Sequence, residues 1–503
     1  MENDLILVNP LEQFDTGNNF VEYLGFSYLA SYLREKGYRV KILDMYLEGI
    51  SLDECITILN VTNSRVIGFT SMSSLYIKNI KYILSRLDRR NRTFVVGGLY
   101  ATQNYKQILN DLDNLDYVFL GEGEKTFNEF LNNLKHRLPL NGIKGLAYKQ
   151  DGTIHSNGMR EFLTHEEILN LPRPAHDTLE MSLKRNGIPQ IAMSRGCYGN
   201  CSFCAISNYY KENLQCRWRG LDVFTCIDEL EYLVNHYHVN YVDFCDEEFI
   251  GPHTVENSKR LQQFTDEIQK RNIVVRYMIY CRSNDVSEEL FLRLKKSGLD
   301  RVFLGIEFGN NSLLRRYGKG TSVEMNVRAI NLLKKLDIKL SVGYIMFEPF
   351  MDIKLLRDNM NFYFQYCPFK LDRLATKMGI FPNTKLYEEA KESLGLKHTV
   401  WDEILGDHYP YHFIDNRVEI VYQAMIALKG ILSKSKSYYK IKTSSKNANE
   451  YEHNFDKWKK ELHEKITQLI NKLIVIDSNL LKGEQIVSDF IKSITIWDHT
   501  YLL

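Results

Sequence analysis

Residues 193–204 read MSRGCYGNCSFC and place three cysteines, Cys197, Cys201 and Cys204, on one short loop. Three thiolates bind three irons of a four-iron cubane and leave the fourth iron open to a ligand that is not protein. A structural zinc site is the alternative, but zinc takes a closed set of four ligands. Residues 205–208, AISN, add neither cysteine nor histidine. The motif therefore predicts a 4Fe-4S cluster with one reactive iron.

The CxxxCxxC spacing, with Phe203 just before the last cysteine, resembles the cluster loop of radical S-adenosylmethionine (SAM) enzymes. In that family the amino and carboxylate groups of SAM chelate the open iron. One electron from the cluster then cleaves the sulfonium to give a 5'-deoxyadenosyl radical. The resemblance implies SAM as a cofactor, Phe203 beside it, and an electron donor of the flavodoxin or ferredoxin type as a partner.

The length and the charge of the chain limit the class of protein to which it can belong. The chain has 503 residues, 44% of them hydrophobic, which is enough for about three domains with cores of their own. Its 64 basic and 63 acidic residues leave a net charge of +1, so no electrostatic case for nucleic acid follows. The start does not read as a signal peptide, and no uncharged apolar run has the length of a membrane span. The sequence predicts a soluble, cytoplasmic protein.

Nine cysteines in a chain of this size are too few and too irregular for a disulfide framework. The six outside the motif are each expected to be small buried hydrophobes: Cys55, Cys216, Cys226, Cys245, Cys281 and Cys367. A second cluster assembled from Cys216, Cys226 and Cys245 is the alternative, although cluster ligands usually come in close spacing.

The first part of the chain alternates short apolar runs with helical patterns. Strands are expected at 5–8, 39–43, 66–70, 93–97 and 117–120, and helices at 24–36, 52–59, 77–87, 100–110 and from 126. Five such units predict a doubly wound, Rossmann-like parallel sheet over residues 1–140, with ligands at the carboxyl ends of its strands. A connector over 141–185 follows, with a hairpin turn in LAYKQDGT and two prolines, Pro172 and Pro174, that forbid a continuous helix.

A second α/β series follows over residues 186–395. Strands are expected at 190–193, 241–245, 275–280, 301–305, 340–346 and 373–379, and helices at 223–237, 255–270, 288–297 and 323–336. Six units predict a partial (βα)6 barrel of the TIM type, with its chemistry at the carboxyl ends of the strands. Residues 396–503 read as a helical domain, notably at 454–474 and 483–494. The Lys-, Ser- and Tyr-rich stretch 429–446 is expected to be a solvated segment, with a site for an anionic partner as the alternative.

Three segments of the first domain, LGFSYLA (24–30), GGLYAT (97–102) and GEGEKT (121–126), resemble the cobalamin-binding domain fused to many radical SAM enzymes. The resemblance implies cobalamin as a second cofactor. Relatives that carry a DxHxxG loop use its histidine as the lower cobalt ligand, whereas this chain reads DMYLEG with Tyr46 in the histidine place. Tyrosine is protonated at neutral pH and binds metals poorly. We therefore expect cobalamin without a histidine ligand, which favours departure of its methyl group as a radical equivalent.

Small residues after the strands are expected to contact cobalamin. The candidates are Tyr46, Thr70, Ser71, Gly97, Gly98, Gly121, Glu122 and Gly123. Gly97 and Gly98 let backbone approach a flat macrocycle or the nucleotide tail. Ordinary turns between strands and helices are the alternative explanation of these glycines.

A binding site for SAM needs a carboxylate, a basic group and apolar packing. The segment DFCDEEF (243–249) is similar to the acidic segment that meets the SAM amino group in the family, which makes Asp246 or Glu247 the expected contact. An acid at a helix start is the alternative. Arg282 is expected to pair with the SAM carboxylate by a forked hydrogen bond, and Glu307 to accept from the ribose hydroxyls. A buried salt bridge is the alternative for either residue.

The resemblance implies a cobalamin-dependent radical SAM methyltransferase that acts on an unactivated carbon of a small molecule or peptide. Radical rearrangement, oxidation or cyclisation without net methyl transfer is the first alternative, and a non-catalytic cobalamin sensor is a second. A methylthiotransferase is disfavoured, because that family has a further cysteine triad before the barrel and this chain has only Cys55 there. No catalytic side chain is identified. Glu348 and Asn383 stand where relatives often have glycine.

Overall fold

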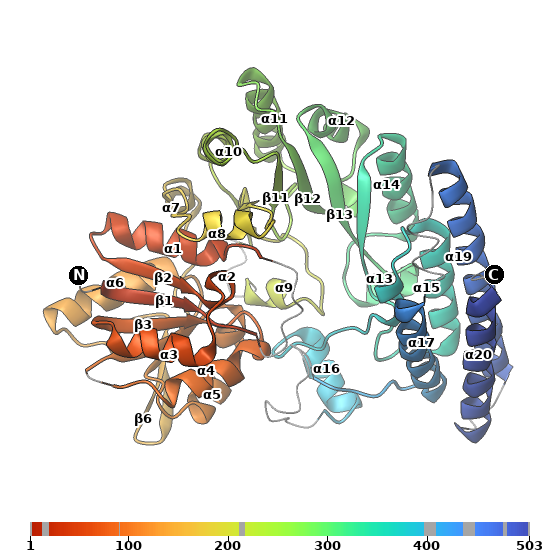
Figure 1. Ribbon diagram of the computed structural model, residues 1–503, viewed down its shortest axis with the longest axis horizontal. Helices are drawn as coiled ribbons and strands as arrows, with labels where there is room; N and C mark the ends of the chain where they lie inside the picture. Colours follow the sequence, from red (N-terminus) through yellow and green to blue (C-terminus); the bar gives the residue numbers. More distant parts are fainter. Residues whose placement is uncertain are drawn as a thin grey trace.

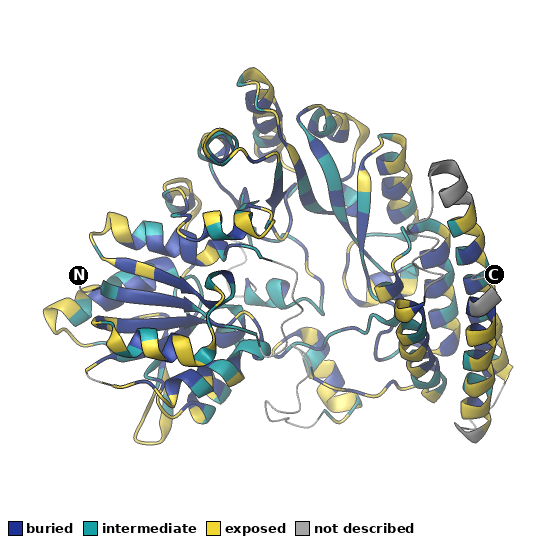
Figure 2. Ribbon diagram, in the orientation of Figure 1, coloured by how far each residue is buried: buried dark blue, intermediate teal, exposed yellow. Residues whose placement is uncertain are grey.

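The computed structural model describes residues 3–12, 20–89, 91–210, 217–396, 409–435, 448–475 and 480–500. Two sheets with their helices lie side by side, and the helices of the C-terminal part flank the second sheet on the side away from the first (Figure 1). Buried residues run along the strands of both sheets (Figure 2). Cys216 and residues 436–446 lie outside the described residues.

The first sheet has the strand order β2-β1-β3-β4-β5-β6-β7. Its parallel part consists of β1 (Asn3–Asn9), β2 (Val40–Asp44), β3 (Ser64–Thr70), β4 (Thr93–Gly97) and β5 (Tyr117–Phe119). A hairpin, β6 (Leu146–Gln150) and β7 (Thr153–Ser156), extends it antiparallel. The doubly wound sheet and the hairpin turn are confirmed.

Helices cover both faces of this sheet, which explains why β1 is apolar at every central position. Leu5 and Leu7 pack with α1 (Leu24–Glu35) and α6 (Gly123–His136). Ile6 and Val8 pack on the other face with α3 (Leu52–Val61), α4 (Ile77–Leu84) and α5 (Leu99–Asp111). The carboxyl ends of the strands are left for the loops that form the site.

The second sheet is parallel, with the order β14-β13-β12-β11-β8. Its strands are β8 (Gln190–Ile191), β11 (Tyr241–Phe244), β12 (Arg276–Arg282), β13 (Leu299–Glu307) and β14 (Lys339–Tyr344). The helices of this part are α10 (Val223–Tyr237), α11 (Val255–Lys270), α12 (Glu288–Lys296), α13 (Asn311–Arg316), α14 (Val323–Lys335), α15 (Ile353–Tyr366) and α16 (Lys385–Ser393). The α/β fold class with a partial barrel is confirmed.

The sixth barrel strand, expected at 373–379, does not form as an extended strand. The 3-10 helix η4 (Leu371–Ala375) occupies its first half, and a single parallel bridge joins Phe347 to Lys377. The backbone N–H groups of Arg373 and Thr376 close local turns onto Lys370 and Arg373. Those groups are therefore unavailable for a ladder with β14, and the prediction of a sixth full strand is wrong.

The cysteine loop leaves the barrel beside its first strand. β9 (Ser194–Gly196) pairs antiparallel with β10 (Trp218–Gly220), and α9 (Ala205–Tyr209) follows Cys204 directly. In the C-terminal part, α17 (Asn416–Lys434), α19 (Ala448–Val475) and α20 (Leu480–Thr500) confirm the predicted helical region. Trp458 on α19 is fully buried in the same core as the barrel.

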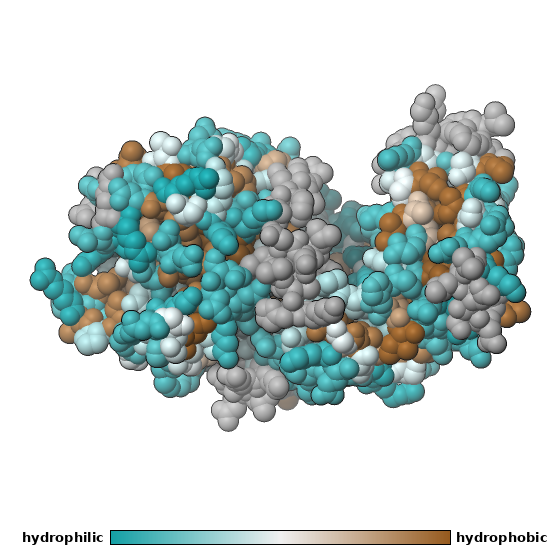
Figure 3. Space-filling view, turned by 90° about the horizontal axis from the view of Figure 1, so that it is seen from below, coloured by the Kyte–Doolittle hydropathy of each residue, from teal (hydrophilic) through white to brown (hydrophobic). Residues whose placement is uncertain are grey.

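Hydrophilic side chains dominate the face seen in Figure 3, and apolar ones gather mainly on the side of the C-terminal helices. Val475 and Ile496, at the end of α19 and in α20, are among the exposed hydrophobic residues. None of the helices in the described part of the chain is long and apolar enough to cross a membrane.

Candidate functional site

The three motif cysteines lie in a loop that is largely shielded from solvent. Cys201 is buried and Cys197 and Cys204 are half-buried. The Gly199 backbone N–H donates to the Cys197 sulfur over 3.3 Å. Burial raises the pKa of Cys197 to about 12 and raises that of Cys204 as well. A metal cluster is therefore the partner that would hold these groups as thiolates, since coordination deprotonates a thiol.

The arrangement fits a cluster better than a single ion. Among the residues that the structure describes, no three His, Cys, Asp or Glu side chains converge closely enough to hold one metal ion. A zinc site requires that convergence, whereas thiolates that each bind a different iron of a cubane do not. The 4Fe-4S cluster is therefore the group that this donor set fits.

Two cations reach the cysteine loop from the barrel. Arg282 Nη1 lies 3.7 Å from the Cys201 sulfur, and its Nη2 donates to the backbone carbonyl of Lys319. The buried Lys319 ammonium lies 3.0 Å from a Glu307 carboxylate oxygen. Burial alone would lower the pKa of Lys319, but the Glu307 carboxylate beside it raises that pKa overall. Of the two predicted residues, Arg282 contacts the cysteine loop, and Glu307 is linked to Arg282 through Lys319.

Lys319 was not predicted from the sequence. Its segment, YGKGT, follows α13 and carries no strand-end pattern, although two flanking glycines mark a tight loop. Phe203 packs edge-on against Tyr317 of the same segment, with ring centroids 6.0 Å apart. The loop after α13 therefore braces both the cysteine motif and the barrel rim.

Of the acids in the DFCDEEF segment, Asp246 and Glu247, the two expected at SAM, face opposite ways. Asp246 accepts hydrogen bonds from the Met193 backbone N–H and the Ser194 hydroxyl, and burial raises its pKa to about 7. Glu247 lines the large cavity and accepts from the Gly196 backbone N–H over 3.1 Å. Side chains alternate along an extended segment, so Glu247 is the acid that faces the cavity, while Asp246 supports β9 from behind.

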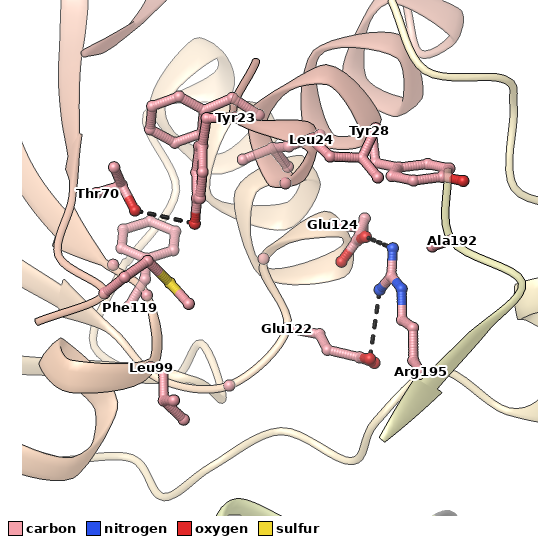
Figure 4. Close-up of a pocket in the computed structure, with 18 of the residues that line it drawn as sticks. Tyr23, Leu24, Tyr28, Thr70, Leu99, Phe119, Glu122, Glu124, Ala192 and Arg195 are labelled. Atoms are coloured by element: carbon pink, nitrogen blue, oxygen red, sulfur yellow. Dashed lines mark hydrogen bonds and ion pairs between the residues drawn. The ribbon is translucent and has the colours of Figure 1, made fainter. Parts of the chain in front are cut away.

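A cavity of about 450 Å³ lies between the carboxyl edge of the first sheet and the barrel (Figure 4). The first domain contributes mainly glycines and apolar or aromatic side chains, among them Tyr23, Leu24, Phe26, Tyr28, Gly68, Leu99, Phe119 and Phe127. The barrel side contributes Gln190, Ala192, Ser194, Arg195, Cys245 and Glu247, and α9 and the residue after it contribute Ile206, Tyr209 and Tyr210.

Most of the residues expected to contact cobalamin line this cavity. They are Thr70, Gly97, Gly98, Gly121, Glu122 and Gly123. At Gly98, with φ +107°, a Cβ atom would lie 2.6 Å from the Ser71 carbonyl oxygen, so only glycine fits. This wall consists of glycines and mostly apolar side chains, so a flat macrocycle could pack closely against it.

Tyr46 and Ser71 lie outside the cavity lining. Tyr46, in α2 (Met45–Glu48), stacks on Phe20 with centroids 5.0 Å apart, and its carbonyl accepts from Arg185. The Ser71 hydroxyl donates to the Ser73 carbonyl. Sequence reasoning instead missed Tyr209 and Tyr210, an edge-on aromatic pair just past the motif that also lines the cavity.

A smaller cavity of about 270 Å³ lies beside the cysteine loop. Cys201 and Cys204 line it together with Asn200, Ser202, Ser207, Asn208, Arg217 and Lys385. Arg217 and Lys385 supply positive charge, and none of these lining residues is acidic.

The domain order and the two cavities define a protein that couples a B12-type sheet to a radical SAM barrel. The B12 binding domain family matches residues 15–131, and the radical SAM superfamily matches residues 191–356. The chain is therefore a cobalamin-dependent radical SAM protein.

Curated relatives carry several activities. The chain is 28% identical over 327 residues to an uncharacterized methyltransferase, PH0819, of Pyrococcus horikoshii, covering 64% of this chain and 69% of that protein. It is 28% identical over 360 residues to 4'-phospho-dehydrooxetanocin synthase of Priestia megaterium, covering 66% of this chain and 47% of that protein. It is 27% identical to the anaerobic magnesium-protoporphyrin IX monomethyl ester cyclase of Rubrivivax gelatinosus, covering 64% of this chain and 58% of the cyclase.

Two solved structures share the fold over most or nearly all of this chain. The cobalamin-dependent SAM radical enzyme OxsB, with aqua-cobalamin and SAM bound, superposes with a TM-score of 0.77 at 22% identity and covers 98% of this chain and 75% of its own. The radical SAM methyltransferase TsrM from Kitasatospora setae, with cobalamin and a [4Fe-4S] cluster bound, gives 0.63 at 17% identity over 80% and 76% of the two chains. At these identities the likeness concerns the fold.

Proposed function

We propose that the protein methylates an unactivated carbon of a small molecule or peptide, using SAM, a 4Fe-4S cluster and cobalamin. The observation that carries this proposal is the single cavity whose walls are the B12-type loops and the barrel residues Arg195, Cys245 and Glu247. Groups bound to the two walls would meet in one space. When bound, the cofactors would supply a radical that abstracts a hydrogen atom from carbon, and a methyl group.

The residue roles follow from that cavity and the cysteine loop. We assign Cys197, Cys201 and Cys204 to the cluster, as its thiolate ligands. We assign SAM to the rim formed by Phe203, Glu247, Arg282, Glu307 and Lys319, which offers both charges that a zwitterionic amino acid needs. We assign cobalamin to the wall formed by Thr70, Gly97, Gly98, Gly121 and Gly123. These assignments correspond to domains at 1–140 and 186–395, joined by the connector 141–185, whose hairpin β6–β7 extends the first sheet, and followed by a helical domain over 396–503.

The aromatic pair Tyr209 and Tyr210 would exclude water from the reacting groups. Burial raises the pKa of both hydroxyls well above 10, so both side chains stay neutral across the working range of pH. A closed, dry space protects a reactive radical from side reactions.

Anaerobic turnover with methyl-deuterated SAM and candidate substrates tests the proposal. Deuterium in a product, together with 5'-deoxyadenosine, supports methyl transfer. Deoxyadenosine formed while every product lacks the label favours the second candidate, a radical rearrangement or cyclisation, which the synthase and cyclase relatives support. Absence of SAM cleavage in protein with an intact cluster would favour a cobalamin sensor.

We also propose an acidic electron donor of the flavodoxin or ferredoxin type, because Arg217 and Lys385 are the charged residues of the cavity beside Cys201 and Cys204. Opposite charge accelerates association of redox partners and makes it salt-dependent. The double variant Arg217→Glu, Lys385→Glu is expected to raise the KM for reduced flavodoxin about tenfold. SAM cleavage driven by dithionite should not change, and an unchanged KM would contradict the docking site.

A further inference from the structure

Glu122, expected above to contact cobalamin, is fully engaged by protein. Its Oε1 accepts from Arg219 Nη2 over 2.8 Å and from Arg195 Nη1 over 3.3 Å. Its Oε2 accepts from Arg219 Nη1 over 3.1 Å and from the Leu163 backbone N–H over 2.8 Å. A carboxylate has about four acceptor sites, and four donors occupy them. Glu122 therefore has no acceptor site left for a cofactor amide.

Arg195 bridges Glu122 to a second acid of the same turn. Its Nη2 lies 2.7 Å from Glu124 Oε1, and its guanidinium lies over the Tyr28 ring, 5.6 Å from the centroid. Figure 4 shows Arg195 reaching from the barrel side toward both acids. The side chains of Glu122, Glu124, Arg195 and Arg219 are 10%, 6%, 18% and 2% exposed. Two acids and two arginines thus form a nearly neutral buried cluster, which we call the ionic joint.

The ionic joint links the two loops that carry the proposed cofactors. Arg195 and Arg219 are opposed residues of the β9–β10 pair, and β9 ends at Gly196, immediately before Cys197. Glu122 and Glu124 alternate with Gly121 and Gly123, which line the cavity from the first domain. A displacement of the 121–124 turn would therefore be transmitted through two guanidinium groups to the strand that carries the first cysteine.

The charges of the ionic joint favour one fixed position of the two loops relative to each other and contribute little to the free energy of unfolding. Burial alone would raise the pKa of Glu122, but the charges of Arg195 and Arg219 lower it overall, so the acid stays ionised beside two permanent cations. Buried ion pairs of this kind contribute little net stability, yet breaking one partner leaves an uncompensated charge. Such a cluster specifies geometry, since a shifted loop would leave charges unpaired.

We propose that the ionic joint couples the cobalamin site to the cluster loop, so that occupancy of one orders the other. Glu122 is then a positioning residue and not a cobalamin ligand. The inference rests on the proposed cofactors but not on the reaction. Coupling between two binding events is reciprocal and is typically worth about 5- to 150-fold in affinity.

Hydrogen–deuterium exchange on the full-length protein, kept anaerobic and without added substrate, tests the coupling. Hydroxocobalamin is expected to slow exchange in the peptide 194–204 of the wild-type protein about tenfold. In Glu122→Gln the amide NH₂ would face two arginines, so that protection should be lost while cobalamin absorbance is still acquired. Reciprocally, reconstitution of the cluster should tighten cobalamin binding in the wild type and leave it unchanged in the variant.

Glu161→Gln is the matched control, because Glu161 makes an exposed ion pair with Lys144 over 2.6 Å near the same turn. It should behave as the wild type. Should Glu122→Gln lose its fold by circular dichroism, Glu124→Gln, which removes one contact to Arg195, takes its place and should weaken the response partially. Equal protection of 194–204 in wild type and variants would overturn the ionic joint as a coupling device. Failure of the wild type to bind cobalamin would overturn the proposed function instead.

Discussion

The two walls of the large cavity are built from different kinds of group. The wall from the first domain consists mainly of backbone at Gly97 and Gly98 and of apolar rings such as Phe119, and its two acids, Glu122 and Glu124, are paired with Arg195. The barrel wall presents Arg195 and Glu247 close to the cysteine loop. A large flat cofactor is recognised by shape and backbone approach, whereas a buried zwitterion requires charged partners. This contrast favours the assignment of cobalamin to the wall of the first domain and of SAM to the barrel wall. Substitutions can therefore change one wall alone or the contacts that join the two walls.

The largest effect is expected from Cys201→Ala, which acts on the barrel wall alone. Cys201 is the buried member of the triad and contacts Arg282. Two thiolates should not retain a competent cubane, so 5'-deoxyadenosine formation should fall to background. At saturating cobalamin its absorbance should persist, because the wall of the first domain is untouched, although loss of the cluster is expected to weaken cobalamin affinity through the ionic joint. Unchanged SAM cleavage, measured by chromatography, would refute the cluster assignment.

Gly98→Val acts on the opposite wall. Its Cβ would meet the Ser71 carbonyl at 2.6 Å from a backbone with φ +107°, a conformation that costs a β-branched residue roughly 1–3 kcal/mol or more. Cobalamin retention on gel filtration should drop at least about tenfold, since 1.4 kcal/mol is a factor of ten in binding.

Gly142→Ala is the control for that substitution, since its added Cβ meets nothing within 4 Å. It should retain cobalamin as the wild type does. Full retention by Gly98→Val, with the fold intact by circular dichroism, would show that this wall does not hold the corrin.

The contrast between the walls also explains how much the sequence could predict. Helices α10 and α11 match their predicted bounds because Asp222 and Thr254 cap them and amphipathic spacing continues to their ends. The cysteine triad is local in sequence, so its role could be inferred from spacing alone. The sixth strand could not be excluded, because only the fold reveals that turns consume the N–H groups near Arg373.

Contacts between the two domains could not be predicted from local sequence patterns. The choice between Asp246 and Glu247 depends on which face of an extended segment meets the cavity. The partners of Glu122, by contrast, lie 73 and 97 positions away at Arg195 and Arg219. The glycines at the strand ends indicated the first wall, because a site formed by backbone atoms needs glycine, and glycine is visible in the sequence. The ion pairs between Arg195 of the second wall and Glu122 and Glu124 of the first left none, because this pairing exists only after the domains dock.

An intermediate effect is expected from pH, through a second ionic contact, which joins the first domain and the barrel through the connector. His176 donates to Glu22 before α1 and to Glu229 on α10, each over 2.6 Å, and Arg173 lies 3.0 Å from the other Glu229 oxygen. Burial alone would lower the pKa of His176, but the bonds to both acids raise it from 6.5 to about 9. That increase corresponds to about 3 kcal/mol of stabilisation.

Because the folded pKa of His176 is the higher one, its stabilisation is complete below about pH 6.5 and is lost as the pH rises through about 9. Urea unfolding between pH 6 and pH 9.5 should show this loss in the wild type and a flatter profile in His176→Gln. Identical pH profiles would exclude His176 as a titrating link. The ionic joint at Glu122, built on arginine, should show no such alkaline loss.

The smallest effect is expected from Tyr46→Ala. Tyr46 occupies the place where relatives with a DxHxxG loop have a histidine, but it stacks on Phe20 outside the cavity lining, and its carbonyl rather than its hydroxyl meets Arg185. Cobalamin binding and its absorbance spectrum should therefore match the wild type, and loss of the ring contact with Phe20 should cost about 1 kcal/mol of stability. A shifted or lost corrin spectrum would mean that the first wall supplies a side-chain ligand after all, and the contrast between a backbone-built wall and a charged wall would have to be abandoned.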